Sequence, residues 1–231
     1  MIKFVVGKPA LLVEKSLVIG DLHLGIEEKL EKKGINIGSL SHSMGAEARK
    51  IFEESGAERM VILGDVKDEI GYPTKAGYSS MREFFGELSR IRITIVKGNH
   101  DAHIREVLSS IGVDCTVEKE LLLNSAALVH GHAYPSKEAL KKRYLIIGHG
   151  HIAYGPLGGS IEKVWLIAES KKKKKLIIMP AFNPLITGSN IANWDTDMMI
   201  FRAGSFDARK AKVYSLQGEL LGTLGELSKQ G

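Results

Sequence analysis

Five short polar clusters recur along this chain, and each follows directly after a short apolar run rich in β-branched residues. The clusters are Gly20-Asp21-Leu22-His23, Gly64-Asp65-Val66-Lys67-Asp68, Gly98-Asn99-His100-Asp101, His130-Gly131-His132 and Gly148-His149-Gly150-His151. Seven of the eight histidines lie in or beside these clusters, and His42 is the exception. Short apolar runs predict buried strands, so oxygen and imidazole groups are expected at the ends of several strands. A pair of divalent metal ions needs such donors.

The composition is that of an ordinary folded protein. The 231 residues suit one large domain or two small ones, and we expect a single domain over residues 1–231. Apolar residues make up 44% and charged residues 26%, which argues against disorder. No apolar stretch approaches the roughly 20 residues of a membrane span, and the N-terminus does not resemble a signal peptide. The single cysteine, Cys115, leaves no internal disulfide, so we expect a cytoplasmic protein without a membrane partner.

The formal net charge of +5 comes from one local patch. Lys171 to Lys175 contribute five positive charges, so the rest of the chain is neutral overall. A run of this kind is typical of a solvated turn. Contact with a nucleic-acid backbone is the alternative interpretation.

Apolar periodicity predicts an antiparallel meander, then helices alternating with strands, and finally a strand-rich second half. Strands are expected at 3–6, 10–13, 17–19, 60–63, 91–96, 116–119, 121–123, 126–129, 144–147, 164–168, 176–179, 211–216 and 219–224. Helices are expected at 41–54, 79–89 and 103–111, with a helical turn at 136–142. This order indicates an α/β architecture with two sheets, and ligands bind such sheets at the carboxyl ends of their strands.

The donors in the clusters form a mixed oxygen and nitrogen set without a thiolate. They are Asp21, His23, Asp65, Asn99, His130, His149 and His151. Such a set fits Mn²⁺, Fe²⁺ or Zn²⁺ better than copper or an iron–sulfur cluster. Seven donors are too many for one tetrahedral ion, whereas two ions that share a carboxylate would use them all. The members of the pairs Asp21/His23 and His149/His151 stand two positions apart, so an extended backbone would direct both to one side.

Two ions about 3.5–4 Å apart can clamp a phosphate and hold a shared hydroxide for in-line attack. Hydrolysis of a phosphoester gains most from this arrangement, because charge develops on both the attacking and the leaving oxygen. Each cluster alone is also compatible with an ordinary turn or helix cap. The five clusters in this order, each after a strand, make the pattern specific.

Taken together, the five clusters resemble the motif pattern of the calcineurin-like metallophosphoesterase superfamily. Its pattern runs Asp-x-His, Gly-Asp-x-x-Asp, Gly-Asn-His-Asp/Glu, a histidine after a strand, and Gly-His-x-His, and all five parts occur here in that order. The resemblance implies a four-layer αββα sandwich, with two mixed β-sheets flanked by helices and a dinuclear site on one rim. It implies one ion on Asp21, His23 and His151, a second on Asn99, His130 and His149, and Asp65 as the bridge. Mn²⁺ is the expected ion, with Fe²⁺, Zn²⁺ and Ni²⁺ as alternatives.

Within the superfamily the chain is similar to the small stand-alone phosphoesterases related to the SbcD-type repair nucleases, in the branch sometimes called ICC-like. The stretch Pro180-Ala181-Phe182-Asn183-Pro184-Leu185 and nearby Asn190 carry this second resemblance. SbcD-type nucleases add a DNA-capping domain after the last motif, whereas only 80 residues follow His151 here. We therefore do not expect DNA-end processing in that style. A sandwich without a cap leaves its cleft open, so a homodimer that completes the pocket is one expected partner.

His100 is the expected general acid. It neighbours Asn99, and an imidazolium there could protonate a leaving alkoxide. Asp101 is expected to orient that imidazole, as carboxylates commonly do. A histidine that only binds phosphate or supports the structure is the alternative for His100.

Three further residues near the clusters are not expected to be among the seven metal ligands. Asp68 is expected to support its neighbours rather than bind an ion. His103 is expected to begin a helix. His132 is open between a contact to substrate and a position near the second ion.

The function indicated is hydrolysis of phosphodiester bonds, with a nucleotide or nucleic acid as substrate. A phosphomonoesterase is the close alternative, because the dinuclear core is shared. A non-catalytic binding scaffold of the same fold is a third interpretation, but it usually goes with gaps in the ligand set, and none is seen here. A purely nucleic-acid-binding role rests on the lysine run alone.

Overall fold

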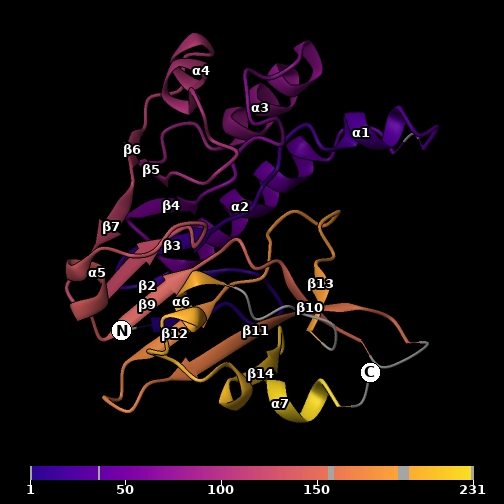
Figure 1. Cartoon of the computed structure of the whole chain (residues 1–231). Coiled ribbons are helices and arrows are strands. Elements are labelled where there is room, and N and C mark those ends of the chain that lie inside the picture. The colour runs from indigo at the N-terminus through magenta and orange to yellow at the C-terminus, as the bar shows by residue number, and fades with distance from the viewer. Residues whose placement is uncertain (1, 36, 156–158, 192–197, 230–231) are drawn as a thin grey trace.

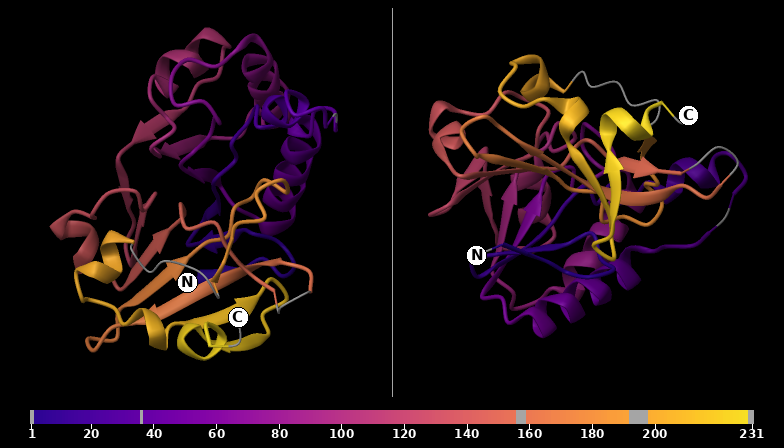
Figure 2. Two further views of the ribbon diagram at one scale, coloured as in Figure 1. Left: turned by 45° about the vertical axis from the view of Figure 1, so that its right-hand side comes forward. Right: turned by 90° about the horizontal axis from the view of Figure 1, so that it is seen from below.

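The computed structural model describes residues 2–35, 37–155, 159–191 and 198–229. Two β-sheets pack against each other, and helices cover the outer face of each sheet (Figure 1). The right-hand view of Figure 2, seen from below, shows the C-terminal helices on one side of the two sheets and the long N-terminal helix on the other side. This arrangement confirms the four-layer αββα architecture with two mixed sheets.

The first sheet has the strand order β1-β2-β3-β4-β5-β6. Its strands are β1 (Ile2–Phe4), β2 (Leu11–Val13), β3 (Ser16–Ile19), β4 (Arg59–Leu63), β5 (Ile93–Val96) and β6 (Thr116–Glu118). The first three strands form the predicted antiparallel meander, whereas β3 to β6 run parallel. Parallel neighbours need crossover connections, and the helices of the first half of the chain supply them.

Four helices lie in these crossovers: α1 (Glu27–Glu31), α2 (Ser41–Ser55), α3 (Lys75–Glu87) and α4 (Ile104–Ser110). The sequence predicted α2, α3 and α4 but not the short α1. Helix α3 begins about one turn earlier than predicted because Thr74 caps it. The Thr74 hydroxyl accepts a hydrogen bond from the Gly77 amide at 3.1 Å, which satisfies a donor that the first turn leaves without a partner.

The second sheet has the order β13-β10-β11-β12-β9-β8-β7, and β14 joins it by pairing with β11 and β15. Its strands are β7 (Glu120–Leu122), β8 (Ala126–Val129), β9 (Tyr144–Ile147), β10 (Ile152–Tyr154), β11 (Glu162–Glu169), β12 (Lys175–Ile178), β13 (Ser189–Asn190), β14 (Lys212–Ser215) and β15 (Leu220–Thr223). Strands β8, β9 and β12 are parallel, and the hairpins β11–β12 and β14–β15 were predicted. Strands β10 and β13 were not predicted.

Short helices cover the outer face of the second sheet. They are α5 (Lys137–Lys141), α6 (Met199–Arg202), the 3₁₀ turn Ala208–Lys210 and α7 (Leu224–Leu227). Only α5 was predicted, and Ser136 caps it as expected, with its hydroxyl accepting from the Ala139 amide. Over the described residues, none of the helices is both long and apolar enough to cross a membrane.

Strand β4 shows how the sequence builds the two inner layers of the core. Val61 and Leu63 face the second sheet, whereas Met60 and Ile62 face the helices α2 to α4. This alternation follows from the two-residue period of a strand. All four side chains are fully buried, which explains why the run is continuously apolar.

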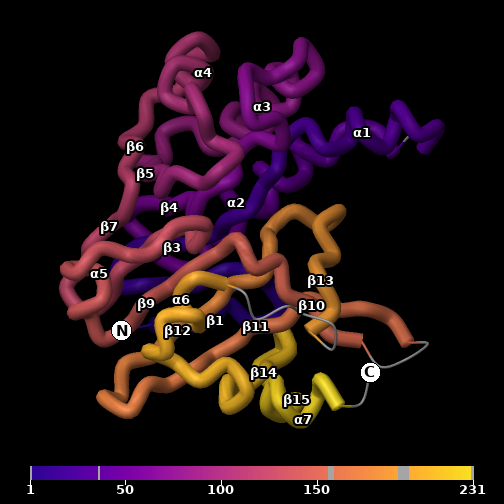
Figure 3. The backbone as a smooth tube through the Cα atoms, viewed as in Figure 1, coloured from indigo at the N-terminus to yellow at the C-terminus, as the bar shows by residue number. Residues whose placement is uncertain are grey.

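The N-terminal meander closes one side of the sandwich. The ring of Phe4 in β1 meets the ring of Trp165 in β11 edge to face, with centroids 4.9 Å apart. The Gly7 amide donates to the Leu216 carbonyl at 2.8 Å. The two sheets are therefore joined at this edge as well as through their faces. Figure 3 traces the backbone of both sheets in the view of Figure 1.

Four lysines of the run, Lys171 to Lys174, lie in the turn between β11 and β12, as predicted, and Lys175 begins β12. Lys171, Lys172 and Lys173 are exposed, and the Ser170 amide closes the turn by donating to the Lys174 carbonyl at 2.9 Å. The run lies at the amino end of β12, whereas His149 follows the carboxyl end of the parallel strand β9. The lysines therefore lie at the opposite edge of the sheet from the histidine clusters.

Candidate metal centre

The loops that follow β3 and β4 are joined by backbone hydrogen bonds. The Asp21 amide donates to the Gly64 carbonyl at 3.0 Å, and the His23 amide donates to the Asp65 carbonyl at 2.8 Å. These bonds extend the parallel pairing of β3 and β4 beyond the ends of the strands. They bring the first two clusters of the sequence to one place.

The backbone at the site is left-handed, and the expectation of extended pairs was wrong. The φ angles are 53° at Asp21, 42° at His23, 47° at Asp65, 63° at His149 and 38° at His151. Asp21 and His23 do join one donor group, whereas His149 and His151 belong to different groups. Turned backbone, rather than the alternation of a strand, directs these side chains. Residues other than glycine adopt this region at a cost of roughly 1–3 kcal/mol each, and such strain gathers at functional sites.

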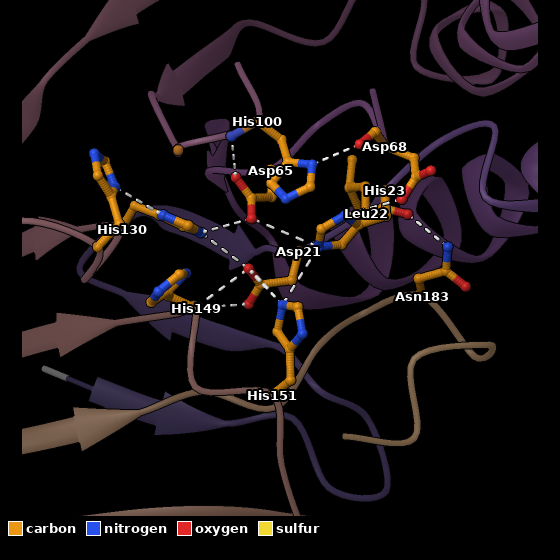
Figure 4. Close-up of polar contacts among 12 residues, drawn as sticks. Asp21, Leu22, His23, Asp65, Asp68, His100, His130, His149, His151 and Asn183 are labelled. Carbon is orange, nitrogen blue, oxygen red and sulfur yellow. Dashed lines mark hydrogen bonds and ion pairs between the residues drawn. The ribbon is translucent and has the colours of Figure 1, made fainter. Parts of the chain in front are cut away.

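A first group of donors lies between the two sheets. Ligand atoms of Asp21, His23, Asp65 and His151 all lie within 4.8 Å of one another. The Nε2 atoms of His23 and His151 are 3.4 Å apart, and His151 Nε2 is 3.2 Å from Asp21 Oδ1 (Figure 4). Three of these four residues are buried, and His151 is partly exposed.

A second group shares one member with the first. Ligand atoms of Asp65, His130 and His149 also lie within 4.8 Å of one another. His130 Nε2 lies 3.5 Å from Asp65 Oδ2 and 3.1 Å from Asp21 Oδ1. Asp65 is thus the residue common to both groups, as Figure 4 makes visible.

Burial and ion pairing together set the charges of the cluster. Burial acts to raise the pKa of Asp21, but hydrogen bonds from His130 and His151 outweigh it and hold that pKa well below its usual range. Burial acts to lower the pKa of His130, yet the Asp21 carboxylate raises it overall. Burial, followed by the charge on His130, lowers the pKa of His149 to about 4. His149 is therefore a neutral imidazole, the form that binds metal ions.

The donor chemistry of the cluster fits cations. Carboxylates can only accept hydrogen bonds, and two imidazole nitrogens that face each other at 3.4 Å cannot both present a proton. Asp21 and Asp65 are also almost completely buried, with 0% and 1% exposure, and buried charges need partners. Oxygen and imidazole donors of this kind suit first-row divalent ions.

The cluster after β5 is divided between the site and the protein interior. Asn99 is exposed, and its amide makes no hydrogen bond to any described residue, so its role as a ligand stays a prediction. Asp101 is fully buried and does not orient the His100 ring as expected. Its two oxygens accept from the backbone amides of Val66 and Gly98, at 2.9 and 2.8 Å. Asp101 therefore joins the loops after β4 and β5.

A backbone carbonyl orients His100 instead. Its Nδ1 lies 2.5 Å from the Asp68 carbonyl oxygen, and its amide donates to Asp65 Oδ1 at 3.0 Å (Figure 4). A carbonyl only accepts, so Nδ1 carries the proton of this hydrogen bond. Nε2 is then the ring atom available to exchange a proton with a substrate. The His100 and His23 rings meet edge to face at 4.9 Å.

The structure also shows where Asp68, His132 and His103 lie, the three residues that were not among the predicted ligands. Asp68 lies between His23 Nδ1, at 3.6 Å, and Lys29 Nζ, at 2.7 Å. Asp68 also forms a third group of possible metal donors with His23 and His100, so its supporting role stays a prediction. His132 is exposed, and its Nδ1 lies 3.0 Å from His130 Nδ1. His103 immediately precedes α4, as expected, and its ring stacks on Tyr72 with centroids 4.5 Å apart.

Sequence reasoning assigned no role in the site to the segment after β12. The Phe182 amide donates to the Gly20 carbonyl at 2.9 Å, and the Asn183 side-chain amide donates to the Leu22 carbonyl at 2.6 Å. Both contacts hold the loop that carries Asp21 and His23. The only signal in the sequence was the family-like stretch around these two residues, which says nothing of its contacts.

Comparison with known proteins agrees with this geometry. The model of the calcineurin-like phosphoesterase superfamily domain matches residues 15–174. The crystal structure of the Pseudomonas putida nuclease MPE is similar, with 16% sequence identity and a TM-score of 0.61 over 94% of this chain and 98% of that chain. Yfce, a phosphoesterase from E. coli, has 19% identity and a TM-score of 0.43 over 90% of this chain and 96% of that chain. A search of curated proteins finds no match.

The first of these structures shares the fold, and the family model covers more than half of the chain, including all five polar clusters. The order of the clusters, the two packed sheets and the buried carboxylate–histidine groups agree with that match. The chain therefore belongs to the calcineurin-like phosphoesterase superfamily.

Proposed function

We propose that this protein is a dinuclear metal-dependent phosphoesterase that hydrolyses phosphodiester bonds in a nucleotide or nucleic acid. The observation that carries the proposal is the position of Asp65, whose carboxylate belongs to both donor groups. One carboxylate between two sets of imidazoles is the arrangement that two neighbouring cations require. The fold shared with a protein described as a nuclease supports the substrate class.

The donors divide into two sets in this proposal. The first ion would be held by Asp21, His23 and His151, the second by Asn99, His130 and His149, and Asp65 would serve both. Mn²⁺ is the proposed ion, with Fe²⁺, Zn²⁺ and Ni²⁺ able to use the same donors. When bound, two ions neutralise the charge that develops on the phosphoryl oxygens and lower the pKa of water.

The other residues of the site orient these donors and move a proton. The His149 amide donates to both oxygens of Asp21, at 3.2 and 3.1 Å, and so fixes the direction of that carboxylate. The His100 amide donates to one oxygen of Asp65, Oδ1, and so helps to direct that carboxylate. From its Nε2 atom the His100 imidazolium donates a proton to the leaving oxygen, which would otherwise depart as an alkoxide.

Two measurements on one preparation test the proposal. Protein reconstituted with Mn²⁺ should retain about two ions per chain by elemental analysis. It should hydrolyse bis-p-nitrophenyl phosphate faster than p-nitrophenyl phosphate. Retention of no metal, or hydrolysis of neither ester, contradicts the proposal as a whole. Two bound ions with preference for the monoester contradict the phosphodiester assignment alone and favour the phosphomonoesterase alternative.

A further inference from the structure

Lys67 is a charged residue placed at the centre of the second polar cluster, and its side chain is completely buried. Its ammonium donates to the backbone carbonyls of Glu69, Ile70 and Gly71, at 2.5, 2.8 and 2.7 Å. It also donates to the backbone carbonyl of His100. Four carbonyls from two separate loops thus converge on one nitrogen atom.

These contacts favour the charged form of Lys67. A carbonyl can only accept, and an ammonium has three N–H donors to share among the four acceptors. A neutral amine would offer only two donors to the same four acceptors, so the charged form satisfies these contacts better. Burial lowers the pKa of Lys67, while the carboxylates of Asp101, Glu69 and Asp65 act to raise it.

The position of His100 is therefore fixed at three points. Its carbonyl is held by Lys67, its amide by Asp65 Oδ1, and its ring Nδ1 by the Asp68 carbonyl. Lys67 is the next residue in the chain to Asp68, so one residue pair holds both the backbone and the ring of His100. The same ammonium binds the carbonyls of the 69–71 turn and so holds that turn close to His100.

We propose that Lys67 is a positioning residue for His100, whose buried ammonium joins the 69–71 turn to the His100 carbonyl and so aims the imidazole at the leaving oxygen. The inference rests on the proposed function, because it assigns His100 the role of proton donor. It explains why a lysine occupies a fully buried place beside two metal-ligating loops.

The test compares two esters that differ only in the leaving group. Thymidine 5′-monophosphate p-nitrophenyl ester releases a stable anion that needs no proton, whereas the methyl ester must be protonated as it leaves. In Lys67→Met, kcat for the methyl ester should fall roughly 10- to 100-fold, because a misplaced catalytic group costs about that much. For the p-nitrophenyl ester, kcat should fall much less.

Lys163→Met is the matched control. Lys163 is also largely enclosed and donates to two backbone carbonyls, those of Ala181 and Asn183, but it does not contact His100. This variant should lose stability while changing kcat for both esters by the same factor. An equal change for both esters in Lys67→Met overturns the positioning role.

A readout without metal or substrate separates this inference from the proposed function. In ¹⁵N NMR spectra of the metal-free protein at a single pH, the His100 ring should carry its proton on Nδ1, with the signal assigned from a His100→Asn variant. Lys67→Met should lose this signature, and Lys163→Met should keep it. An unchanged His100 signal in Lys67→Met overturns the inference, even if the enzyme is active. If Lys67→Met does not fold, Lys67→Gln, which keeps two N–H donors but no charge, takes its place in both measurements.

Discussion

The Nε2 atoms of His23 and His151 face each other at a distance of 3.4 Å. His23 follows β3 of the first sheet, and His151 lies between β9 and β10 of the second. Two ring nitrogens at this distance share either a proton or a cation. The candidate metal centre therefore lies where the two sheets meet, and a cation bound there would hold them together.

Metal binding should therefore stabilise the folded protein. A ligand that binds only the native state at about 100 times its Kd adds about 2.7 kcal/mol to the free energy of unfolding. Thermal unfolding with Mn²⁺ and with excess EDTA measures the difference. Asp21→Asn, which removes a charge from the first donor group, should abolish most of the shift. Equal unfolding temperatures with and without metal would exclude a site between the sheets.

Asp65→Asn should affect both ions at once, because Asp65 belongs to both donor groups. Elemental analysis should show fewer than two ions per chain, and kcat should fall at least roughly 100-fold. Asp68→Asn is the control, because Asp68 contacts the His23 ring but is proposed not to bind an ion. At saturating Mn²⁺ that variant should retain two ions, with affinity lowered by about 10- to 100-fold. The prediction fails if the two variants behave alike.

His100→Asn should separate proton transfer from metal binding. Loss of a general acid lowers kcat by roughly 10²–10⁴-fold, while the metal content should remain that of the wild type. His42→Asn is a suitable control, since His42 is exposed on α2 and lies outside every polar cluster. Wild-type rates in His100→Asn on an ester with an alkoxide leaving group would remove His100 from the mechanism.

Gly98→Ala should disrupt the site through a steric clash alone. A Cβ atom at Gly98 would lie 2.2 Å from Asp65 Oδ1 and 2.4 Å from the Asp65 amide nitrogen. The Asp65 carboxylate must then move, so metal retention and activity should both be lost. Gly86→Ala in helix α3 meets nothing within 4 Å and should stabilise the protein by about 0.5–1 kcal/mol. Chemical denaturation and metal analysis of the two variants distinguish local crowding from a general effect of alanine.

Cys115 should be a slow nucleophile at neutral pH. Burial, followed by the nearby Asp114 carboxylate, raises the pKa of its thiol. The thiolate is the reactive form, so a raised pKa leaves less of it at pH 8. The rate of alkylation by iodoacetamide, followed by mass spectrometry, should have its midpoint above about 8.5, the value of a free cysteine. A midpoint below that value would show an exposed or activated thiol.

Much of the fold could be predicted from local pattern. The continuous apolar runs at β4, β5, β8 and β9 predicted buried strands, and glycine, proline and lysine turns marked the hairpins. Helix α1 was missed because its five residues carry mostly charged side chains and show no apolar period. Strands β10 and β13 were missed because two or three residues are too few for a periodic signal. Their pairing depends on neighbours that are distant in the sequence.

The sequence by itself determined that the carboxylate and histidine donors gather, because donors placed after parallel strands must meet at the edge where those strands end. It did not determine how the donors point or what orients them. The left-handed backbone at Asp21 and His149, the use of Asp101 to join two loops, and the Lys67 contact to His100 all depend on segments far apart in the chain. Such contacts form only when the two sheets pack, since hydrogen bonds between loops leave no periodic trace in the sequence. Tertiary structure therefore decided how the side chains of the site are oriented, whereas local sequence pattern decided which carboxylate and histidine residues come together there.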